Sequence, residues 1–187
     1  HFWAGADLKD MAGARARLAE DPDAVTKVNA AFGELCIAYA GASLAVIAVL
    51  EGTVMGGGFG LACVTDVAIA AENTVFRLPE TSLGVLPAQI APFLVERLGY
   101  AEAKRLAVTG SRIGAAEALQ IRLVHEVHPA DALDAALARV VGDILQCAPG
   151  ALAATKALVS RARWEQPALL VKDAARAFSR AALGPEG

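Results

Sequence analysis

Apolar residues recur in the first quarter of the chain at the three-to-four spacing of an amphipathic helix. The clearest stripe consists of six residues: Val25, Val28, Phe32, Leu35, Cys36 and Tyr39. Asp21-Pro22-Asp23 precedes it and is typical of an N-cap with proline in the first helical turn, while Gly41 ends it. A second, shorter helix is predicted to begin near Leu8, capped by Asp7.

The pattern then changes to short apolar runs that are rich in β-branched residues. Residues 44–50 form such a run between Gly41 and Gly52 and predict a buried strand. Residues 67–70 and 75–78 predict two further strands. The glycine run at 56–58 is predicted to open a short helix that ends near Thr65.

Helical spacing dominates from Pro87 onward, and glycine or proline separates the segments. Helices are predicted over residues 89–98, 101–109, 114–121, 131–147, 151–163 and 168–182. Residues 124–127 predict a brief strand. The sequence therefore predicts an α/β fold in which strands and loops of the first half carry the chemistry and the later helices form scaffold or oligomer contacts.

Composition limits the classes of protein to which the chain can belong. It has 187 residues, of which 56% are hydrophobic and 20% charged, so we expect one ordered globular domain. The net charge is −3 and the sequence contains no basic run, which argues against a nucleic-acid partner. The nearly uncharged stretch 35–65 is interrupted by three consecutive glycines, so we do not expect a membrane span. Three widely spaced cysteines favour a reducing cytoplasm.

The segment 44–62 combines a buried strand, a glycine loop and a helix start. This combination places unpaired backbone N–H groups and the positive end of a helix dipole at Gly56-Gly57-Gly58, where an anion or a developing oxyanion could bind. The alternative is that the three glycines are present only because tight packing at this point needs small residues. Leu61 occupies the last glycine position of a dinucleotide fingerprint, so that class of site is excluded.

A second turn of small residues, Ala4-Gly5-Ala6-Asp7-Leu8, also leads into a helix. Together, the two turns offer two separate backbone donors that could converge on one carbonyl oxygen, as an oxyanion hole requires.

Titratable residues suggest one further candidate group. Glu80 follows the apolar strand 75–78 and is either a surface cap or a partly desolvated acid-base group with a raised pKa. His125 and His128 could suggest a metal pair, but no third ligand is evident and surface histidines are favoured. The Gly-x-Ser-x-Gly motif of serine hydrolases is absent.

In this order, the motifs resemble those of the crotonase superfamily, the enoyl-CoA hydratase/isomerase family. The matching segments cover almost the whole chain: 2–8, 46–58, 66–70, 76–80, 83–85, 106–110, 115–119 and 154–158.

The resemblance implies a crotonase-type spiral of ββα units over residues 1–128 and a C-terminal helical oligomerisation region over 129–187. It also implies that the chain begins inside the first oxyanion motif and lacks early strands and a terminal helix. We expect a homotrimer or a dimer of trimers in the cytoplasm, with an acyl-CoA as the substrate. We expect no metal or redox cofactor, and no nucleic-acid or membrane partner.

The resemblance assigns roles to single residues. The backbone N–H groups of Ala6 and Gly57 would hold the thioester oxygen, and Glu80 would be the acid-base residue. The residues expected to contact the CoA thioester are Ala4, Ala6, Asp7, Leu8, Gly57 and Gly58.

Two departures from the family pattern affect the expected chemistry. Gly60 stands where two-glutamate hydratases have their first glutamate, and Pro87-Ala-Gln-Ile-Ala-Pro-Phe93 replaces a glycine-rich stretch. Both features are similar to single-glutamate isomerases and, more closely, to hydratases of glutaconyl-type substrates. We therefore predict a hydratase of 2-enoyl-CoA, with a branched glutaconyl-CoA as the candidate substrate, whose own carboxylate would order water in the space left by Gly60. A Δ3-Δ2 enoyl-CoA isomerase and a non-catalytic acyl-CoA-binding subunit are the alternatives.

Overall fold

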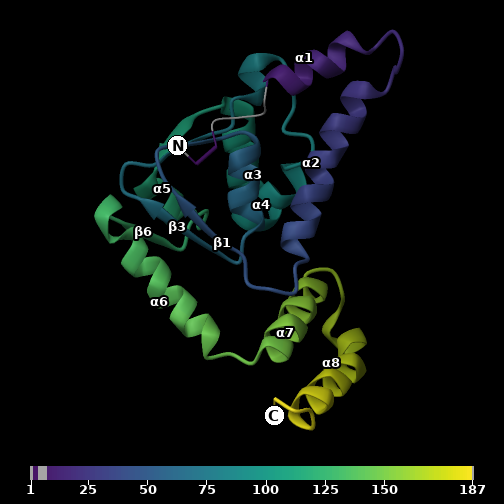
Figure 1. Cartoon of the computed structure of the whole chain (residues 1–187), viewed down its shortest axis with the longest axis vertical. Helices are drawn as coiled ribbons and strands as arrows, with labels where there is room; N and C mark the ends of the chain where they lie inside the picture. The colour runs from purple at the N-terminus through teal and green to yellow at the C-terminus, as the bar shows by residue number, and fades with distance from the viewer. Residues whose placement is uncertain (1, 4–7, 187) are drawn as a thin grey trace.

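The computed structural model describes residues 2, 3 and 8–186 and has a mixed α/β architecture, as predicted (Figure 1). The α-helices are α1 (Leu8–Ala16), α2 (Ala24–Ala40), α3 (Gly57–Val64), α4 (Ala91–Thr109), α5 (Ala115–Gln120), α6 (Leu133–Leu145), α7 (Pro149–Ala162) and α8 (Pro167–Ala182). The strands are β1 (Ile47–Leu50), β2 (Thr53–Met55), β3 (Val67–Ala71), β4 (Val75–Arg77), β5 (Arg112–Gly114) and β6 (Glu126–His128). Two short 3₁₀ helices are η1 (Glu80–Leu83) and η2 (Ala130–Ala132).

The strands form two three-stranded sheets through which the chain winds as a spiral. One sheet has the order β1-β3-β6 with parallel pairing, and the other has the order β2-β4-β5. Strands β2 and β4 are parallel, whereas β4 and β5 are antiparallel. Each of the first two turns therefore contributes its first strand to one sheet, its second strand to the other, and then a helix.

The main chain at Phe2 and Trp3 extends the second sheet beyond β2. Trp3 forms a parallel bridge with Val54, and its carbonyl accepts a 2.8 Å hydrogen bond from the Met55 N–H. The Phe2 N–H donates to the Glu51 carbonyl at 2.9 Å. Trp3, β2 and β4 thus run side by side in the same direction toward one edge of the sheet.

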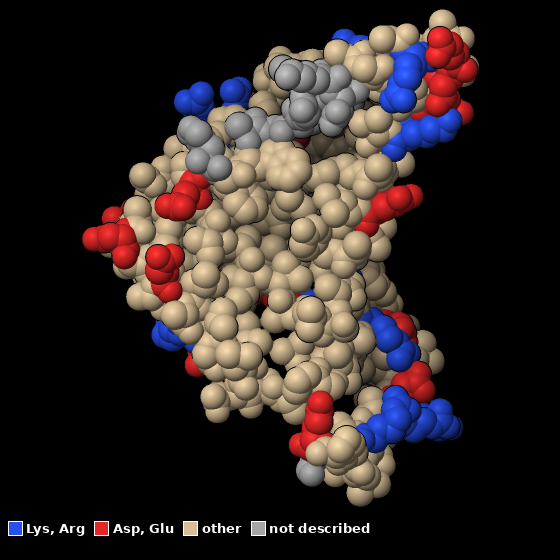
Figure 2. Space-filling view, viewed as in Figure 1, with Lys and Arg blue, Asp and Glu red and all other residues tan. Residues whose placement is uncertain are grey.

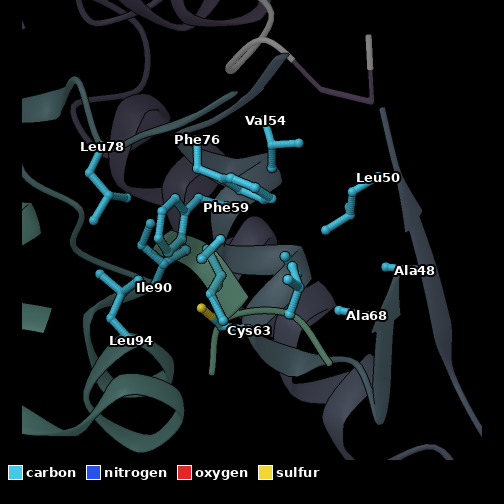
Figure 3. Packing of buried hydrophobic residues seen from close by; sticks show 14 of the residues in the cluster. Ala48, Leu50, Val54, Phe59, Cys63, Ala68, Phe76, Leu78, Ile90 and Leu94 are labelled. Atoms are coloured by element: carbon cyan, nitrogen blue, oxygen red, sulfur yellow. The ribbon is translucent and has the colours of Figure 1, made fainter. Parts of the chain in front are cut away.

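The core is built from small residues and a few large ones. Phe59 of α3 packs edge-on against Phe76 of β4, with ring centroids 6.1 Å apart, and both side chains are fully buried. Figure 3 shows Ile90 and Leu94 on the other side of Phe59, while Ala48 and Ala68 face α3 from the first sheet. Alanine at these positions lets the helix lie close to the strands.

The last two helices extend away from the sheets (Figure 1). Helix α8 packs mainly against α7 and exposes large apolar side chains, among them Leu169, Val171 and Phe178. In the view of Figure 2, charged side chains lie along the rim of the molecule and leave the middle of that face uncharged. Within the described residues no single helix is long and apolar enough to cross a membrane; only the bent pair 130–145 and 149–162, at 98° to each other, reaches that length and hydropathy when taken together.

Most predicted elements are present, with local corrections. Strand β1 begins at Ile47 rather than at residue 44, because the Val46 N–H donates to the Asp66 side chain at 2.7 Å instead of to a neighbouring strand. The Asp23 side chain makes no cap hydrogen bond, and Pro22 precedes α2 instead of lying in its first turn. The break predicted at Gly99 is confirmed, since its φ of 75° and ψ of 161° interrupt α4.

Candidate active site

Three parallel segments end together and place the predicted site residues near one edge of the second sheet. Trp3 is paired with Val54, and Val54 is paired with Phe76. Gly57 follows Val54 by three residues, and Glu80 follows Phe76 by four. The carboxyl ends of parallel strands meet at the same edge, so the turns that contain Gly57 and Glu80 are neighbours.

Part of the predicted site lies outside the described residues. Ala4, Ala6 and Asp7 are among residues 4–7, which the structure does not describe. Leu8 is the first residue of α1, as predicted from the cap pattern. The assigned contacts of Gly57, Gly58 and Leu8 with a CoA thioester remain predictions.

The glycine run forms the start of α3 and leaves a backbone donor free. Gly56 has φ 54° and ψ −118°, a conformation that glycine adopts without strain, and its N–H donates to the Arg77 carbonyl at 3.2 Å. Gly57 is the first residue of α3, and no hydrogen bond to its N–H occurs within the part of the chain that the structure describes. This N–H lies at the positive end of the helix dipole and can donate to a negatively charged oxygen.

The same glycines are also needed for packing, so both interpretations of the motif apply. A Cβ atom on Gly57 would lie 3.0 Å from the Phe32 ring, and one on Gly58 would lie 2.6 Å from the Trp3 Cβ. The rings of Trp3 and Phe32 also contact each other edge-on at a centroid distance of 6.2 Å. Side chains at these two glycines would therefore push the aromatic rings away from the helix start.

Glu80 is a partly buried carboxylate at the first position of η1. Its Oε2 atom is buried and has no hydrogen-bond partner among the described residues. Burial raises the pKa of the Glu80 carboxyl, while its own backbone N–H lowers it to a smaller extent. Glu80 is therefore a desolvated carboxyl rather than an exposed surface cap, and its acid-base role remains a prediction.

Hydrogen bonds to the C-terminal part of α4 fix the loop that carries Glu80. The Arg77 Nε donates to the Gly110 carbonyl at 2.8 Å, and the Thr81 hydroxyl donates to the Ala107 carbonyl at 3.2 Å. These bonds flank Glu80 on both sides in the sequence, so they hold its backbone in place.

Gly60 leaves no open space, which corrects one expectation. A Cβ atom at Gly60 would overlap the Cγ2 atom of Ile90, and both residues are buried. Ile90 belongs to the segment that replaces the family's glycine-rich stretch, so the two departures from the family pattern fit each other sterically. The place where a side chain at residue 60 would begin is filled by hydrocarbon, and a substrate carboxylate has no space there.

Sequence reasoning did not identify the side-chain contact between α2 and the segment that precedes α4. The Gln89 side chain donates from Nε2 to Asn29 Oδ1 at 2.8 Å, and its Oε1 lies where a Cβ on Gly33 would be. Asn29 precedes Phe32 by one helical turn. The sequence offered only the residue types as a signal, one glycine (Gly33) and two amides (Asn29 and Gln89). Their proximity is set by the tertiary fold alone.

The two histidines are used in contacts within the protein. The Ala68 N–H donates to His125 Nδ1 at 2.9 Å, and burial followed by the nearby Arg97 lowers the His125 pKa. His128 contacts the Glu126 carboxylate at 2.7 Å. Among the residues described, no group of three or more His, Cys, Asp or Glu side chains is arranged to bind a metal ion.

A cleft of about 730 Å³ lies at the other end of α3 and is distinct from the candidate site. Its lining includes Cys63, Arg97 and Lys156, but neither Gly57 nor Glu80. Lys156 is paired with Asp66 at 2.6 Å, and the Arg97 guanidinium donates to carbonyls at the end of α3. These cations therefore already have partners within the protein.

Comparison with known proteins extends the resemblance to the whole chain. The sequence model of the enoyl-CoA hydratase/isomerase family matches residues 1–180. The probable enoyl-CoA hydratase echA8 of Mycobacterium tuberculosis is 37% identical over 162 residues, which cover 86% of this chain and 60% of that protein. The 2,3-dehydroadipyl-CoA hydratase of Escherichia coli is 34% identical over 131 residues, covering 70% of this chain and 48% of that protein. The chain thus spans roughly half to three fifths of the length of these relatives.

Solved structures match the fold over the full chain. Pseudomonas aeruginosa AtuE superimposes with a TM-score of 0.96 at 50% identity, and an enoyl-CoA hydratase/isomerase from Marinobacter aquaeolei with a TM-score of 0.94 at 48% identity. Each match covers 100% of this chain and 72% of the other. The crotonase-type fold predicted from the motifs is therefore confirmed.

Proposed function

The chain belongs to the enoyl-CoA hydratase/isomerase family, and we propose that it is a hydratase that adds water to the double bond of a 2-enoyl-CoA. The observation that carries the proposal is the partnerless buried oxygen of Glu80. The strand that leads to Glu80 is paired with the strand that leads to Gly57, whose N–H has no partner within the described residues. Desolvation favours proton uptake by such a carboxylate, and an N–H at a helix start favours an anion.

We propose that Ala6 and Gly57 form the oxyanion hole. Trp3 and Val54 are paired in register, and Ala6 and Gly57 each follow their paired residue by three positions. This equal spacing of Ala6 and Gly57 from a pair of parallel residues supports the proposal that their two N–H groups donate to one oxygen. Addition of a nucleophile to the β-carbon of the thioester moves negative charge onto its carbonyl oxygen, so two fixed donors lower the barrier.

Glu80 performs the proton transfer in this proposal. The oxygen of water bonds to the β-carbon while one of its protons passes to the Glu80 carboxylate. The enolate then collapses, the same proton passes from Glu80 to the α-carbon, and the carboxylate is regenerated. The product is a 3-hydroxyacyl-CoA. Because the steps need only hydrogen-bond donors and a base, we propose that the CoA thioester is substrate and that no metal or redox cofactor takes part.

We propose a substrate whose acyl chain itself carries a carboxylate, with a branched glutaconyl-CoA as the specific candidate. The segment from Pro87 to Phe93, together with Gly60, is the basis in the sequence. The Escherichia coli relative is named as a hydratase of 2,3-dehydroadipyl-CoA, which is also a carboxylated enoyl thioester.

The proposal is tested by a panel of enoyl-CoA and glutaconyl-CoA thioesters with product identification by mass spectrometry. The protein should convert at least one 2-enoyl-CoA to its 3-hydroxyacyl product, and Glu80→Gln should lower the rate by about 10²- to 10⁴-fold. Glu72→Gln, which alters an exposed carboxylate after β3, is the matched control. Binding of thioesters without turnover of any of them would instead support a non-catalytic acyl-CoA-binding subunit.

A Δ3-Δ2 enoyl-CoA isomerase is the second candidate, and the Gly60–Ile90 contact favours it. Isomerisation needs one base to move one proton between two carbons, and it needs no water near residue 60. Incubation with a 3-enoyl-CoA in heavy water separates the two activities. An isomerase converts this thioester to the 2-enoyl-CoA with deuterium incorporated and stops there. A hydratase without isomerase activity leaves the 3-enoyl-CoA unchanged and forms a deuterated 3-hydroxyacyl-CoA only from the 2-enoyl-CoA.

We propose assembly as a homotrimer or a dimer of trimers, with residues 129–187 providing much of the contact surface. Exposed apolar side chains on α8 support the assignment: Leu169 is 69% exposed and Phe178 is 76% exposed. Isolated exposed apolar residues are common, but several on one projecting helix are typical of an interaction surface.

We propose a cytoplasmic location, which the cysteines support. Cys36, Cys63 and Cys147 are all free thiols, and the first two are buried. Burial raises the pKa of Cys63 to about 12, so this thiol remains protonated and unreactive. Free thiols persist in a reducing compartment.

A further inference from the structure

Among the described residues, no second carboxylate stands beside Glu80 to hold the attacking water, because Ile90 fills the space beside Gly60. Hydration needs the water oxygen directed at the β-carbon while Glu80 accepts a proton. One carboxylate alone fixes only one of the water's hydrogen bonds. A polar group from another element must therefore complete its coordination.

We propose that the amide pair of Asn29 and Gln89 positions the attacking water. The inference rests on the proposed hydratase activity and names residues that carry it out. Gln89 belongs to the segment between η1 and α4, directly before Ile90, and Asn29 belongs to α2. The pair thus joins the segment that fills the Gly60 space to the helix that packs beside Gly57.

The pair is built into the packing of the protein. The Gln89 amide lies against Gly33, where a Cβ atom would overlap its Oε1 atom, and Gly33 is buried. Its Nε2 donates to Asn29 Oδ1 at 2.8 Å. The close contact with Gly33 and the hydrogen bond that Gln89 donates to Asn29 therefore hold the Gln89 side chain in one place.

Asn29 lies on the same face of α2 as Phe32 and Gly33, because the three residues follow three-to-four spacing. Phe32 and Gly33 of α2 lie beside Gly57 and Gln89, respectively. Asn29 precedes Gly33 by four residues, about 6 Å along the helix axis. Because Phe32 already reaches the first residue of α3, we infer that the preceding turn of α2 flanks the space in front of the Gly57 N–H.

The free hydrogen-bonding groups of the pair suit a neutral water molecule. Within the described residues, the Asn29 amide nitrogen has no partner, and the Gln89 nitrogen keeps one N–H beyond its bond to Asn29. One amide N–H can donate to a lone pair of water, and the other lone pair is left to attack the β-carbon. A neutral amide does not take up the water's proton, so proton transfer stays with Glu80 and the pair acts by positioning.

The test compares two reactions of the same protein that differ in their need for water. Asn29→Ala should lower kcat for hydration of a 2-enoyl-CoA by about 10- to 100-fold with KM changed less than threefold. Exchange of the α-proton of a saturated acyl-CoA in heavy water requires Glu80 and the oxyanion hole but no added water, and it should change less than threefold. Gln89→Met keeps the length of the side chain against Gly33 and should reproduce this pattern.

Glu34→Ala provides the control, since it alters an exposed residue on the same helix α2. It should leave both reactions unchanged. An equal loss of hydration and exchange in Asn29→Ala, or a change confined to KM, would overturn the water-positioning role. An unmodified protein that exchanges the α-proton but hydrates no thioester would instead contradict the hydratase proposal itself.

Discussion

The pKa of Glu80 links activity to stability at the level of one residue. Burial raises this pKa from its ordinary value of 4.5, so the folded state binds the proton more tightly than the unfolded state does. Below pH 4.5 both states are protonated and burial of a charge costs nothing. As pH rises from 4.5 through the raised pKa, the unfolded state loses its proton first and the folded protein must then bury a carboxylate. The free energy of unfolding therefore falls over this pH range.

Replacement of Glu80 by glutamine should therefore stabilise the protein in a pH-dependent way. We expect the Tm of Glu80→Gln to be close to that of the unmodified protein at pH 4 and higher at pH 8, because the variant never buries the charge. Thermal unfolding at both pH values measures this, with Glu72→Gln as the baseline for an exposed glutamate. A Tm difference that is constant between pH 4 and pH 8 would contradict a desolvated Glu80.

A second prediction concerns Gly60 and Ile90, because a side chain at residue 60 would occupy the volume of the Ile90 side chain. Gly60→Ala should destabilise the protein by about 1–3 kcal/mol through overpacking against Ile90. Ile90→Ala alone should cost about 2–5 kcal/mol, since it leaves a cavity. In the double variant the new methyl group fills part of that cavity, so urea unfolding should give a combined loss smaller than the sum of the two. Additive losses would show that the two side chains do not share space.

At the residue scale, local motifs allowed Glu80 and Gly57 to be proposed from the sequence, and their roles remain predictions. Glu80 and Gly57 stand in short motifs after predicted strands, and the family resemblance that assigned their roles is confirmed by the family match. Ile90 and Gln89 could not be found in that way, because their effects depend on Gly60 and Gly33, which are distant in the chain. Only the packing of α2 and α3 against the segment before α4 brings them together.

At the scale of elements, two glycines in helical segments should respond in opposite ways to the same substitution. Gly99 has φ 75° and ψ 161° at the break in α4, a conformation in which an L-residue is strained, so Gly99→Ala should cost about 1–3 kcal/mol. Gly142 lies within α6, and a Cβ there would meet no atom within 4 Å. Gly142→Ala should therefore stabilise the protein by about 0.5–1 kcal/mol. Chemical denaturation measures the free energy of unfolding of both variants. If both substitutions changed it in the same direction, the break in α4 would be contradicted.

Elements were predicted well where periodicity extends over several residues and poorly where it does not. Helices α2, α6, α7 and α8 carry apolar positions over three or more turns and match their predicted ranges closely. Strands β2 and β5 were missed because neither forms an apolar run: β2 lies between Gly52 and Gly56, and Ile113 is the only large apolar residue of β5. Strand β6 begins at Glu126 rather than at 124, because the Ala68 N–H donates to the His125 side chain instead of to the main chain of that segment.

At the scale of the whole molecule, the proposed site depends on how the spiral of strands and helices aligns segments that are distant in the sequence. Strands β2 and β4 come from successive ββα units, and their parallel pairing brings Gly57 and Glu80 to one edge of the second sheet. Trp3 joins the same sheet through its parallel bridge with Val54. The boundary at residues 128 and 129 between core and oligomerisation region, the glutaconyl specificity and the trimeric assembly stay predictions.

Exchange of the α-proton of an acyl-CoA thioester tests this alignment most directly, because it needs both the oxyanion donors and Glu80. In heavy water, with a saturated acyl-CoA and detection by mass spectrometry, the protein should incorporate deuterium at the α-carbon. Glu80→Gln should reduce the rate by at least about 100-fold, while Glu72→Gln leaves it unchanged. Equal rates of exchange in the unmodified protein and in Glu80→Gln would contradict the central claim that Glu80 acts on an enolate formed at the start of α3.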